Sequence, residues 1–216
     1  MTTLEFIVQK YKLDMDQKNM PIEIPDISRE DLPELFEELG FNVGAEIGVE
    51  SGMFSYSILS KTPGLRMLYS IDAWKAYRGY RDHTSQEKLD RFYKETQEKL
   101  KPFVDANRCL IWKKSSAEAV KEFPDNSLDF VYIDANHAFY NVAFDIHHWL
   151  KKVRPGGILA GHDYKKHKKG VNIHVKQVVQ AYADSYYISP WFVIGLNAML
   201  PGLKRDISRS WMFIKE

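Results

Sequence analysis

Acidic residues stand among closely spaced glycines in one short segment, Gly44-Ala-Glu46-Ile-Gly48-Val-Glu50-Ser-Gly52. The segment joins a branched apolar run to a helical pattern, which is where a nucleotide cofactor meets an α/β sheet. A dinucleotide-binding turn needs Gly-x-Gly-x-x-Gly, whereas the spacing here is Gly48-x-x-x-Gly52 and Glu50 takes the place of the second glycine. A pyrophosphate would meet the like charges of Glu46 and Glu50, so the turn argues against NAD and FAD.

The same charges favour a cationic cofactor. S-adenosylmethionine carries a sulfonium and an ammonium and no phosphate, so carboxylates beside a glycine turn attract it. We therefore predict that this cofactor binds to Glu46, Gly48, Glu50 and Gly52, together with Ser55 in the helical pattern that follows. A second interpretation, in which a glycine only allows tight packing, stays open for the first glycine of the segment.

The ends of the next two predicted strands supply polar side chains for an adenosine. Asp72 lies 20 residues beyond Gly52, where its carboxylate can accept hydrogen bonds from both ribose hydroxyls. The alternative role for Asp72 is to cap a helix or a turn. Trp74 either stacks on the adenine or belongs to the core. Ser115 and Ser116 follow the third apolar run, where they either meet the adenine amine or cap the next helix.

A second polar group predicts the acceptor side of the site. Asp134 and His137 come after the fourth apolar run, and His162 and Asp163 come after the fifth. Methyl transfer from a sulfonium to a hydroxyl is an in-line displacement, so the hydroxyl must be held close and must lose its proton. His137 is the predicted general base because imidazole titrates near neutral pH. Asp134 is predicted to share the catalytic role and to contact the cofactor as well.

The same side chains also predict a divalent metal site. Asp134 and Asp163 offer the oxygen ligands that Mg²⁺ prefers, and His162 suits a softer ion. A bound ion would polarise the acceptor hydroxyl and lower its pKa. Two routes to proton removal therefore stay open. In one, an ion held by these three residues activates the hydroxyl; in the other, His137 removes the proton from a hydroxyl that the site holds close to the methyl group, without an ion.

The elements that must position these residues follow from the apolar pattern. Seven short runs are rich in branched and aromatic side chains: Val43–Val49, Met67–Ala73, Cys109–Trp112, Leu128–Ile133, Gly157–Ala160, Trp191–Ile194 and Trp211–Ile214. Helical patterns separate most of them, at Leu32–Leu39, after the capping box of Thr84 and Glu87, and over Phe139–Leu150 until Arg154-Pro-Gly-Gly stops the pattern. This alternation predicts an α/β fold with a doubly wound, mostly parallel sheet, at whose carboxyl edge the polar groups meet.

Length and composition predict one compact domain, since the chain has 216 residues, is 44% hydrophobic and has a formal net charge of +1. Residues 1–30 are expected to form an N-terminal extension that covers the site or makes a homodimer contact. Residues 31–216 are expected to form the main domain, with an insertion at 74–107. The alternating Tyr and Arg side chains of Ala76–His83 either close over a substrate or form ordinary surface.

Features that are absent from the sequence predict the cellular compartment and the classes of partner. There is no run of about 18 apolar residues and no apolar leader, so we expect a soluble, cytoplasmic protein with no membrane partner. The single cysteine, Cys109, fits a reducing compartment. The balanced charge and the shortness of the basic stretch Lys165–Lys169 argue against nucleic acid as a partner.

Several motifs together resemble class I S-adenosylmethionine-dependent methyltransferases: Glu46-x-Gly-x-x-x-Gly52, Asp72, Leu128-Asp-Phe-Val-Tyr-Ile-Asp134 and Val153-Arg-Pro-Gly-Gly-Ile-Leu. The resemblance runs from about Val43 to the end of the chain. It implies a Rossmann-like, seven-stranded sheet in residues 31–216, with Trp211–Ile214 as an antiparallel last strand inserted beside the sixth.

Among the branches of this family, the chain is most similar to small O-methyltransferases such as macrocin O-methyltransferase. In that branch an acid after the fourth strand and an acidic pair after the fifth hold a metal ion. Asp134 and Asp163 match these positions, whereas the first member of the pair is His162 here. This departure bears directly on which ion, if any, the site takes.

The resulting expectation is O-methylation of a small-molecule hydroxyl, with or without a divalent metal. An RNA or protein acceptor is the second hypothesis, and the near-neutral charge and the absence of an Asn-Pro-Pro-Tyr motif after the fourth strand stand against it. A module that binds S-adenosylmethionine without catalysis is the third. Fold alone does not decide between them.

Overall fold

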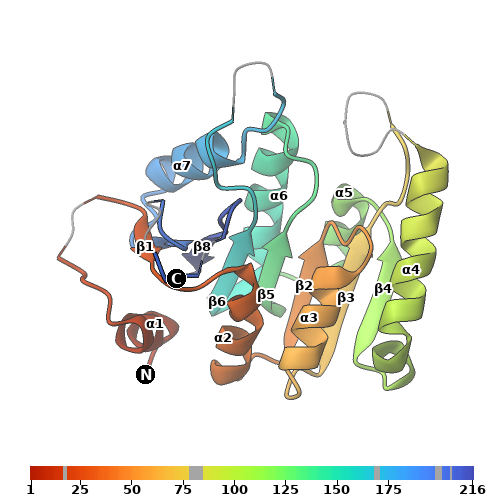
Figure 1. Cartoon of the computed structure of the whole chain (residues 1–216), viewed down its shortest axis with the longest axis horizontal. Coiled ribbons are helices and arrows are strands. Elements are labelled where there is room, and N and C mark those ends of the chain that lie inside the picture. The colour runs from red at the N-terminus through yellow and green to blue at the C-terminus, as the bar shows by residue number, and fades with distance from the viewer. Residues whose placement is uncertain (17–18, 78–84, 168–170, 198–200, 205) are drawn as a thin grey trace.

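The computed structural model describes residues 1–16, 19–77, 85–167, 171–197, 201–204 and 206–216, and its centre is one sheet. The described residues form eight strands: β1 (Ile22–Ile24), β2 (Val43–Ile47), β3 (Met67–Asp72), β4 (Cys109–Lys113), β5 (Leu128–Ile133), β6 (Val153–Gly161), β7 (Trp191–Ile194) and β8 (Trp211–Ile214). Their order across the sheet is β1-β7-β8-β6-β5-β2-β3-β4 (Figure 1).

The direction of the strands confirms the predicted fold class. β8 runs antiparallel between β6 and β7, and the other pairings are parallel. The predicted count of seven strands is one too low, because Ile22–Ile24 pairs with β7 and becomes an edge strand. The predicted run Gly157–Ala160 also begins earlier than expected, since β6 already starts at Val153.

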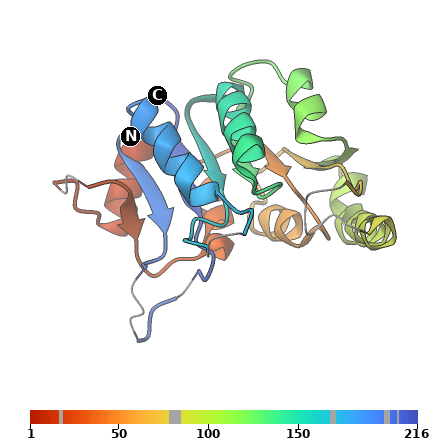
Figure 2. The same ribbon diagram turned by 90° about the horizontal axis from the view of Figure 1, so that it is seen from above.

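Helices cover both faces of the sheet, as a doubly wound arrangement requires. The helical elements are α1 (Thr3–Tyr11), η1 (Arg29–Asp31), α2 (Leu32–Glu38), α3 (Met53–Lys61), α4 (Gln86–Asp105), α5 (Ser116–Ala119), η3 (Val120–Glu122), α6 (Phe139–Lys152) and α7 (Val175–Ser185). Seen from above, α3 and α4 lie on one side of the sheet and α5, α6 and α7 on the other (Figure 2). None of the helices in the described ranges combines the length and the apolar character needed to cross a bilayer.

Each central strand is buried on both faces, which explains its unbroken apolar run. In β5, Val131 and Ile133 belong to the core cluster that includes α6 and α7, whereas Phe130 and Tyr132 belong to the cluster that includes α1, α2 and α3. Because side chains alternate along a strand, one six-residue segment serves both cores. The sheet therefore holds its carboxyl edge rigidly for the loops that leave it.

Two predicted helix boundaries differ from the observed ones in detail. Thr84 and the Tyr/Arg residues Arg78–His83 lie outside the described residues. Ser85 is the N-cap of α4, where its hydroxyl oxygen accepts from the Lys88 amide at 3.3 Å. Helix α6 runs from Phe139 to Lys152, two residues beyond the predicted pattern, and Arg154-Pro-Gly-Gly, which was predicted to stop the helix, lies within strand β6.

The N-terminal segment 1–30 is built into the fold. The Thr2–Glu5 capping box starts α1, Ile7 is fully buried, and the Thr3 hydroxyl donates to the Gly156 carbonyl at 2.5 Å. After β1 the chain crosses to η1, so the segment reaches the carboxyl edge of the sheet. The dimer contact that the sequence predicts for this segment stays a prediction.

The sheet changes winding direction between β2 and β5. The chain passes from β2 to β3 and β4 on one side, then returns through β5 on the other side of β2. Loops that leave the two strands at such a point diverge, and the crevice between them is where α/β sheets bind ligands. The glycine turn after β2 and the Asp134–His137 loop after β5 both leave at this point.

A substitution at Gly44 tests how tightly β2 packs against its neighbours. An added Cβ would lie 2.2 Å from the Phe130 ring, which is stacked on Phe36 at a centroid distance of 4.1 Å and has no room to move. We expect Gly44→Ala to lower the free energy of unfolding by about 1–3 kcal/mol or more in urea denaturation. In the control Gly64→Ala the new Cβ meets only the flexible end of Glu37, so a loss as large as that of Gly44→Ala would contradict the steric explanation.

Candidate active site

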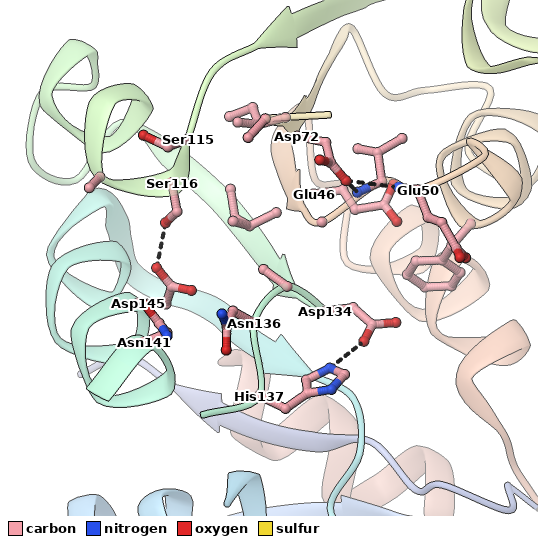
Figure 3. A pocket seen from close by; sticks show the side chains of 18 of the residues that line it. Glu46, Glu50, Asp72, Ser115, Ser116, Asp134, Asn136, His137, Asn141 and Asp145 are labelled. Carbon is pink, nitrogen blue, oxygen red and sulfur yellow. Dashed lines mark hydrogen bonds and ion pairs between the residues drawn. The ribbon is translucent and has the colours of Figure 1, made fainter. Parts of the chain in front are cut away.

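A pocket of about 590 Å³ opens at the carboxyl ends of the central strands (Figure 3). It brings together most of the predicted site residues. Those that line it are Glu46, Gly48, Glu50, Asp72, Ser115, Ser116, Asp134 and His137. Of the other predicted cofactor-binding residues, Gly52, Ser55 and Trp74 do not line it.

Gly48 brings the two sides of the pocket into contact. Its φ is +94°, and an added Cβ would lie 2.2 Å from the Asp134 carbonyl oxygen. The Asp134 amide donates to the Ile47 carbonyl at 2.8 Å, which locks the end of β5 against the end of β2. Glycine is therefore required here by backbone conformation and by space together.

Four amides of the glycine turn are already engaged. The Gly48 amide donates to the Ile71 carbonyl at 2.9 Å, and the Gly52 amide donates to the Val49 carbonyl at 2.9 Å. The amides of Val49 and Glu50 donate to Oδ2 of Asp72 at 3.1 and 3.0 Å. A diphosphate needs free amides at such a turn, so the geometry supports the exclusion of dinucleotides that the charges suggested.

Asp72 and Trp74 hold this turn from behind. Oδ1 of Asp72 accepts from the Trp74 amide at 2.8 Å, and the Trp74 indole donates to the Glu50 carbonyl at 2.8 Å. The Trp74 side chain is 0% exposed and packs with Val49 and Leu89. It has no open face for an adenine, so of the two predicted roles the structure places it in the core.

Glu46 is a buried acid beside the pocket, with 2% of its surface exposed. Side chains alternate along β2, so Glu46 faces α3, where the Ser55 hydroxyl donates to its carboxylate and also lies 2.7 Å from the Ser70 hydroxyl. Burial raises the pKa of Glu46 to about 8, against the opposing effect of the Ser55 hydrogen bond. Ser55 thus positions Glu46, in place of the direct cofactor contact predicted for it.

The far end of the pocket contains an acid that the sequence analysis missed. Ser115 caps α5, as one of its two predicted roles required, and the Ser116 hydroxyl donates to the Asp145 carboxylate (Figure 3). The Trp149 indole donates to Ser116 Oγ at 2.9 Å. Burial raises the pKa of Asp145 to about 7, against the Ser116 hydrogen bond. Its signal was an acid on the otherwise apolar stripe of α6.

A hydrogen bond connects the two loops that border the pocket. The Asn136 side-chain amide donates to the Tyr77 hydroxyl oxygen at 2.6 Å. Tyr77 belongs to the segment after β3 and Asn136 to the loop after β5, so this contact spans the opening between them. The beginning of the predicted insertion therefore does reach the pocket, whereas Arg78–His83 lie outside the described residues.

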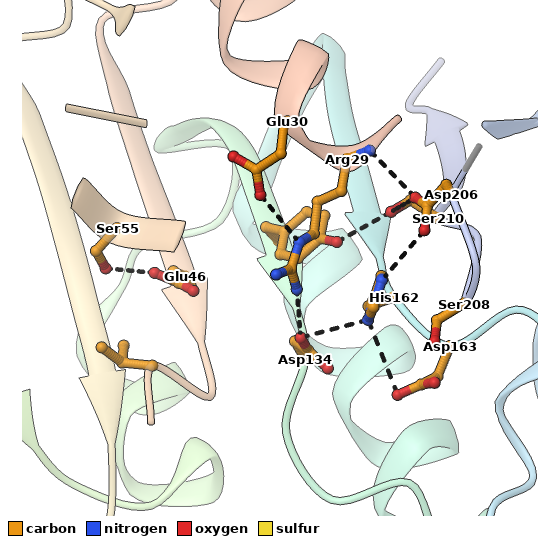
Figure 4. A network of polar contacts seen from close by, with 12 residues as sticks. Arg29, Glu30, Glu46, Ser55, Asp134, His162, Asp163, Asp206, Ser208 and Ser210 are labelled. Carbon is orange, nitrogen blue, oxygen red and sulfur yellow. Dashed lines mark hydrogen bonds and ion pairs between the residues drawn. The ribbon is translucent and has the colours of Figure 1, made fainter. Parts of the chain in front are cut away.

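The predicted acceptor-side residues lie together. Nε2 of His137 is 3.3 Å from Oδ1 of Asp134 and 3.3 Å from Oδ2 of Asp163. Nδ1 of His162 is 3.6 Å from Oδ2 of Asp134, and its Nε2 is 3.6 Å from Oδ1 of Asp206 (Figure 4). Two carboxylates and two imidazoles from the ends of β5 and β6 therefore form one network, with Asp206 as a further member that the sequence analysis missed.

Asp134 is an ionised acid at the centre of this network. Burial alone would raise its pKa, but the hydrogen bond with His137 and the charges of His162 and Arg29 outweigh burial and hold the pKa below its usual range. An ionised Asp134 can accept a hydrogen bond from the His137 ring and orient it. This is the arrangement that a histidine base requires.

The donor atoms of Asp134, His162 and Asp163 also satisfy the basic requirement of a metal site, because one ligand atom from each lies within 4.8 Å of the others. The set contains two oxygens and one nitrogen, which suits a borderline divalent ion better than Mg²⁺. The predicted residues therefore come together, and whether they bind an ion stays a prediction.

Arg29 is a further pocket residue that the sequence analysis missed. It comes from η1, before the first predicted strand, and its Nη1 lies 3.0 Å from Oδ2 of Asp134 (Figure 4). Its guanidinium carbon lies 4.9 Å from the centre of the Phe54 ring. A signal was present, since Arg29 is the one base among nine acids between Glu23 and Glu50.

Comparison with solved structures identifies similar folds. An O-methyltransferase from Bacillus cereus in complex with SAH (S-adenosylhomocysteine) aligns over 99% of this chain and 90% of its own, with TM-score 0.59 and 15% identity. A SAH-bound methyltransferase from Podospora anserina covers 87% and 78%, with TM-score 0.57 and 13% identity. A spermidine synthase from Thermotoga maritima covers 86% and 58%, with TM-score 0.54 and 14% identity. At these identities the likeness concerns the fold.

Comparison with curated proteins gives a partial match. An uncharacterized protein, y4gI, from Sinorhizobium fredii is 22% identical over 105 residues, which is 49% of this chain. The chain spans only 11% of the length of that relative.

A family model described as a methyltransferase domain matches residues 45–164. The match begins on β2 and ends just after β6, so it contains the glycine turn, Asp72 and the Asp134–Asp163 network. Because it covers more than half of the 216 residues, the chain belongs to the methyltransferase domain family.

Proposed function

We propose that the chain is an S-adenosylmethionine-dependent methyltransferase that methylates a hydroxyl group of a small molecule. The observation that carries the proposal is the position of His137, whose Nε2 lies 3.3 Å from both Asp134 and Asp163 at the edge of an acid-lined pocket. The similarity in fold to two SAH-bound methyltransferases supports the choice of cofactor.

The pocket suits a cationic methyl donor. Glu46, Asp72 and Asp134 are acidic, and the amides of the glycine turn are occupied. A sulfonium or ammonium placed among these carboxylates is attracted strongly, because little water remains to screen the charges. We place the amino-acid end of the donor near Glu46 and the adenosine end near Asp72 and Ser116.

His137 is the proposed general base in the transfer. A lone pair of the acceptor hydroxyl oxygen attacks the methyl carbon, and the bond from that carbon to sulfur breaks with its electrons passing to sulfur. The hydroxyl proton goes to the His137 imidazole. Asp134 and Asp163, which both lie beside Nε2 of the ring, stabilise the imidazolium that forms. The products are the methyl ether and S-adenosylhomocysteine.

A divalent ion can assist the same step. Asp134, His162 and Asp163 would hold it, and a bound ion supplies Lewis-acid polarisation of the acceptor hydroxyl. His137 and Arg29 already contact Asp134, so they would have to adjust to an ion there. The resemblance to small macrocin-type O-methyltransferases and the identity of the ion both stay predictions.

The volume of the pocket, about 590 Å³, and the Tyr77–Asn136 hydrogen bond across its opening support a small acceptor over a macromolecular one. Exposed aromatic side chains at its mouth support the same choice, since Tyr140 is 74% exposed and also lines the pocket. An aromatic face of this kind binds flat or partly apolar molecules.

The pKa of Glu46 predicts how cofactor binding depends on pH. With a pKa of about 8 in the free protein, Glu46 is protonated at pH 7, and the ligand ammonium favours its carboxylate form. Binding of S-adenosylhomocysteine should therefore release a proton, and affinity should increase from pH 6 to pH 8 and then level off. Calorimetric titration in buffers of different ionisation enthalpy measures this release.

Glu46→Gln is the matched variant for that titration, and it should bind with a smaller proton release and a flatter pH profile. The Asp145 carboxyl, with a pKa of about 7, is unchanged in this variant and supplies the remaining pH dependence. A profile identical to that of the natural chain would exclude Glu46 as a contact. No binding of S-adenosylhomocysteine by folded natural protein would overturn the proposed function itself.

The role of His137 predicts a separation of binding from chemistry. His137→Gln should reduce methyl transfer to hydroxyl acceptors by about 10²-fold or more, while the affinity for S-adenosylhomocysteine changes less than about twofold. Transfer is measured with labelled methyl donor and a panel of small hydroxyl compounds. His147→Gln is the control, since His147 lies on the same helix beside Tyr182 and outside the lining of the pocket, and it should leave the rate unchanged.

Two results of that experiment would contradict the proposal. An undiminished rate in His137→Gln would remove the proposed base. Binding of S-adenosylhomocysteine by the natural chain without transfer to any acceptor, including RNA and protein, would instead support a non-catalytic binding module.

The metal prediction can be tested without an acceptor. Mn²⁺ is a suitable probe, because its free form is measured directly by electron paramagnetic resonance. If Asp134, His162 and Asp163 hold an ion, Asp163→Asn should weaken Mn²⁺ binding about tenfold or more, and Asp90→Asn on the exposed face of α4 should not. Absence of Mn²⁺ binding by the natural chain would leave His137 as the sole proposed route to proton removal.

A further inference from the structure

The charges that line the pocket are strongly unequal. Among the described residues around it, Arg29 is the one lysine or arginine, and it faces five acids: Glu46, Glu50, Asp72, Asp134 and Asp145. The proposed methyl donor is not purely cationic, since its amino-acid end also carries a carboxylate. This carboxylate needs a donor that offsets the surrounding negative charge.

The turn after β2 offers few hydrogen-bond donors for that carboxylate. The amides of residues 48, 49, 50 and 52 donate to protein acceptors already. These four amides are not available to a carboxylate of the ligand without the loss of an internal hydrogen bond, which leaves side-chain donors as its main partners. Within the described lining of the pocket, Arg29 is the donor with a matching charge.

The position of Arg29 is fixed by its own segment. Its backbone amide donates to Oδ2 of Asp206 at 3.1 Å, and Ser28 and Asp31 close the short helix η1 around it. Its ring contact with Phe54, at 4.9 Å, places the guanidinium beside the first turn of α3. The positive charge of the guanidinium therefore lies beside the positive end of the α3 helix dipole.

The guanidinium also has spare hydrogen-bonding capacity. Nη1 binds Oδ2 of Asp134 at 3.0 Å, and Nε lies 3.7 Å from Glu30. Among the described residues, the side-chain hydrogen bond of Arg29 is made by Nη1. A planar guanidinium can hold Asp134 with one nitrogen and a second carboxylate with the other.

We propose that Arg29 binds the α-carboxylate of the amino-acid end of the methyl donor. The inference rests on the proposed function, since it assumes that the pocket takes S-adenosylmethionine. It assigns a cofactor-binding residue to the N-terminal segment, outside the matched residues 45–164. The sulfonium and ammonium then face Glu46 and Asp134, and the carboxylate faces Arg29.

The test compares two ligands that differ only in this carboxylate. One is S-adenosylhomocysteine, and the other is its decarboxylated analogue, 5′-deoxy-5′-(3-aminopropylthio)adenosine, which keeps the ammonium. Arg29→Met should weaken S-adenosylhomocysteine at least about tenfold. The same variant should bind the analogue as well as the natural chain does, or more tightly, because removing a cation strengthens the attraction of the acids for the ammonium.

The opposite direction of the two effects separates binding from folding, because a distorted pocket weakens both ligands. Arg29→Lys keeps the charge and should recover part of the affinity for S-adenosylhomocysteine. Arg91→Met is the matched control, since Arg91 lies on α4 outside the pocket, with its side chain 63% exposed and an ion pair to Glu95 at 3.7 Å. It should change neither affinity.

Other outcomes would overturn the inference in distinguishable ways. Equal weakening of both ligands by Arg29→Met would make Arg29 a structural residue. Unchanged affinity for S-adenosylhomocysteine, with a raised KM for an anionic acceptor, would assign Arg29 to the acceptor. Failure of the natural chain to bind either ligand would refute the proposed function, and the inference with it.

Discussion

The close approach of the turn after β2 to the end of β5 is the constraint on which the site depends. Gly48 lies against the Asp134 carbonyl with no space for a side chain, and the Asp134 amide is bonded to β2. This contact joins the loop proposed to hold the cofactor to the loop proposed to carry the chemistry. The distance between the two is therefore set by backbone packing inside the sheet, and side-chain rotation has little effect on it.

Buried acids give the pocket its chemical character. Burial raises the pKa of Glu46 to about 8 and that of Asp145 to about 7, whereas Asp134 is kept ionised by the imidazoles and the guanidinium around it. Part of the negative charge of such a site is therefore present in the free protein, and part forms when a bound cation lowers the pKa of the buried acids. That property distinguishes it from a phosphate-binding turn, whose fixed amides favour anions at every pH.

The fold was predictable because each central strand is buried on both faces and its apolar run is unbroken, as in β5. Strand β1 was missed because three residues between prolines become a strand only when β7 offers its edge. Most pocket residues were predictable from their place at strand ends. Arg29 could not be predicted in this way, because it does not follow a predicted strand. The burial of Trp74 could not be predicted either, because its backbone φ of +40° is not indicated by the neighbouring residues in the sequence.

The pairing of β1 with β7 has a consequence for the order in which the molecule is completed. Ile22–Ile24 precede their partner strand Trp191–Ile194 in the sequence by most of the domain. During translation β1 therefore stays without its partner until β7 has been made. Arg29, which follows β1, is held through its amide by Asp206, so its place in the pocket is set by residues that are synthesised long after it.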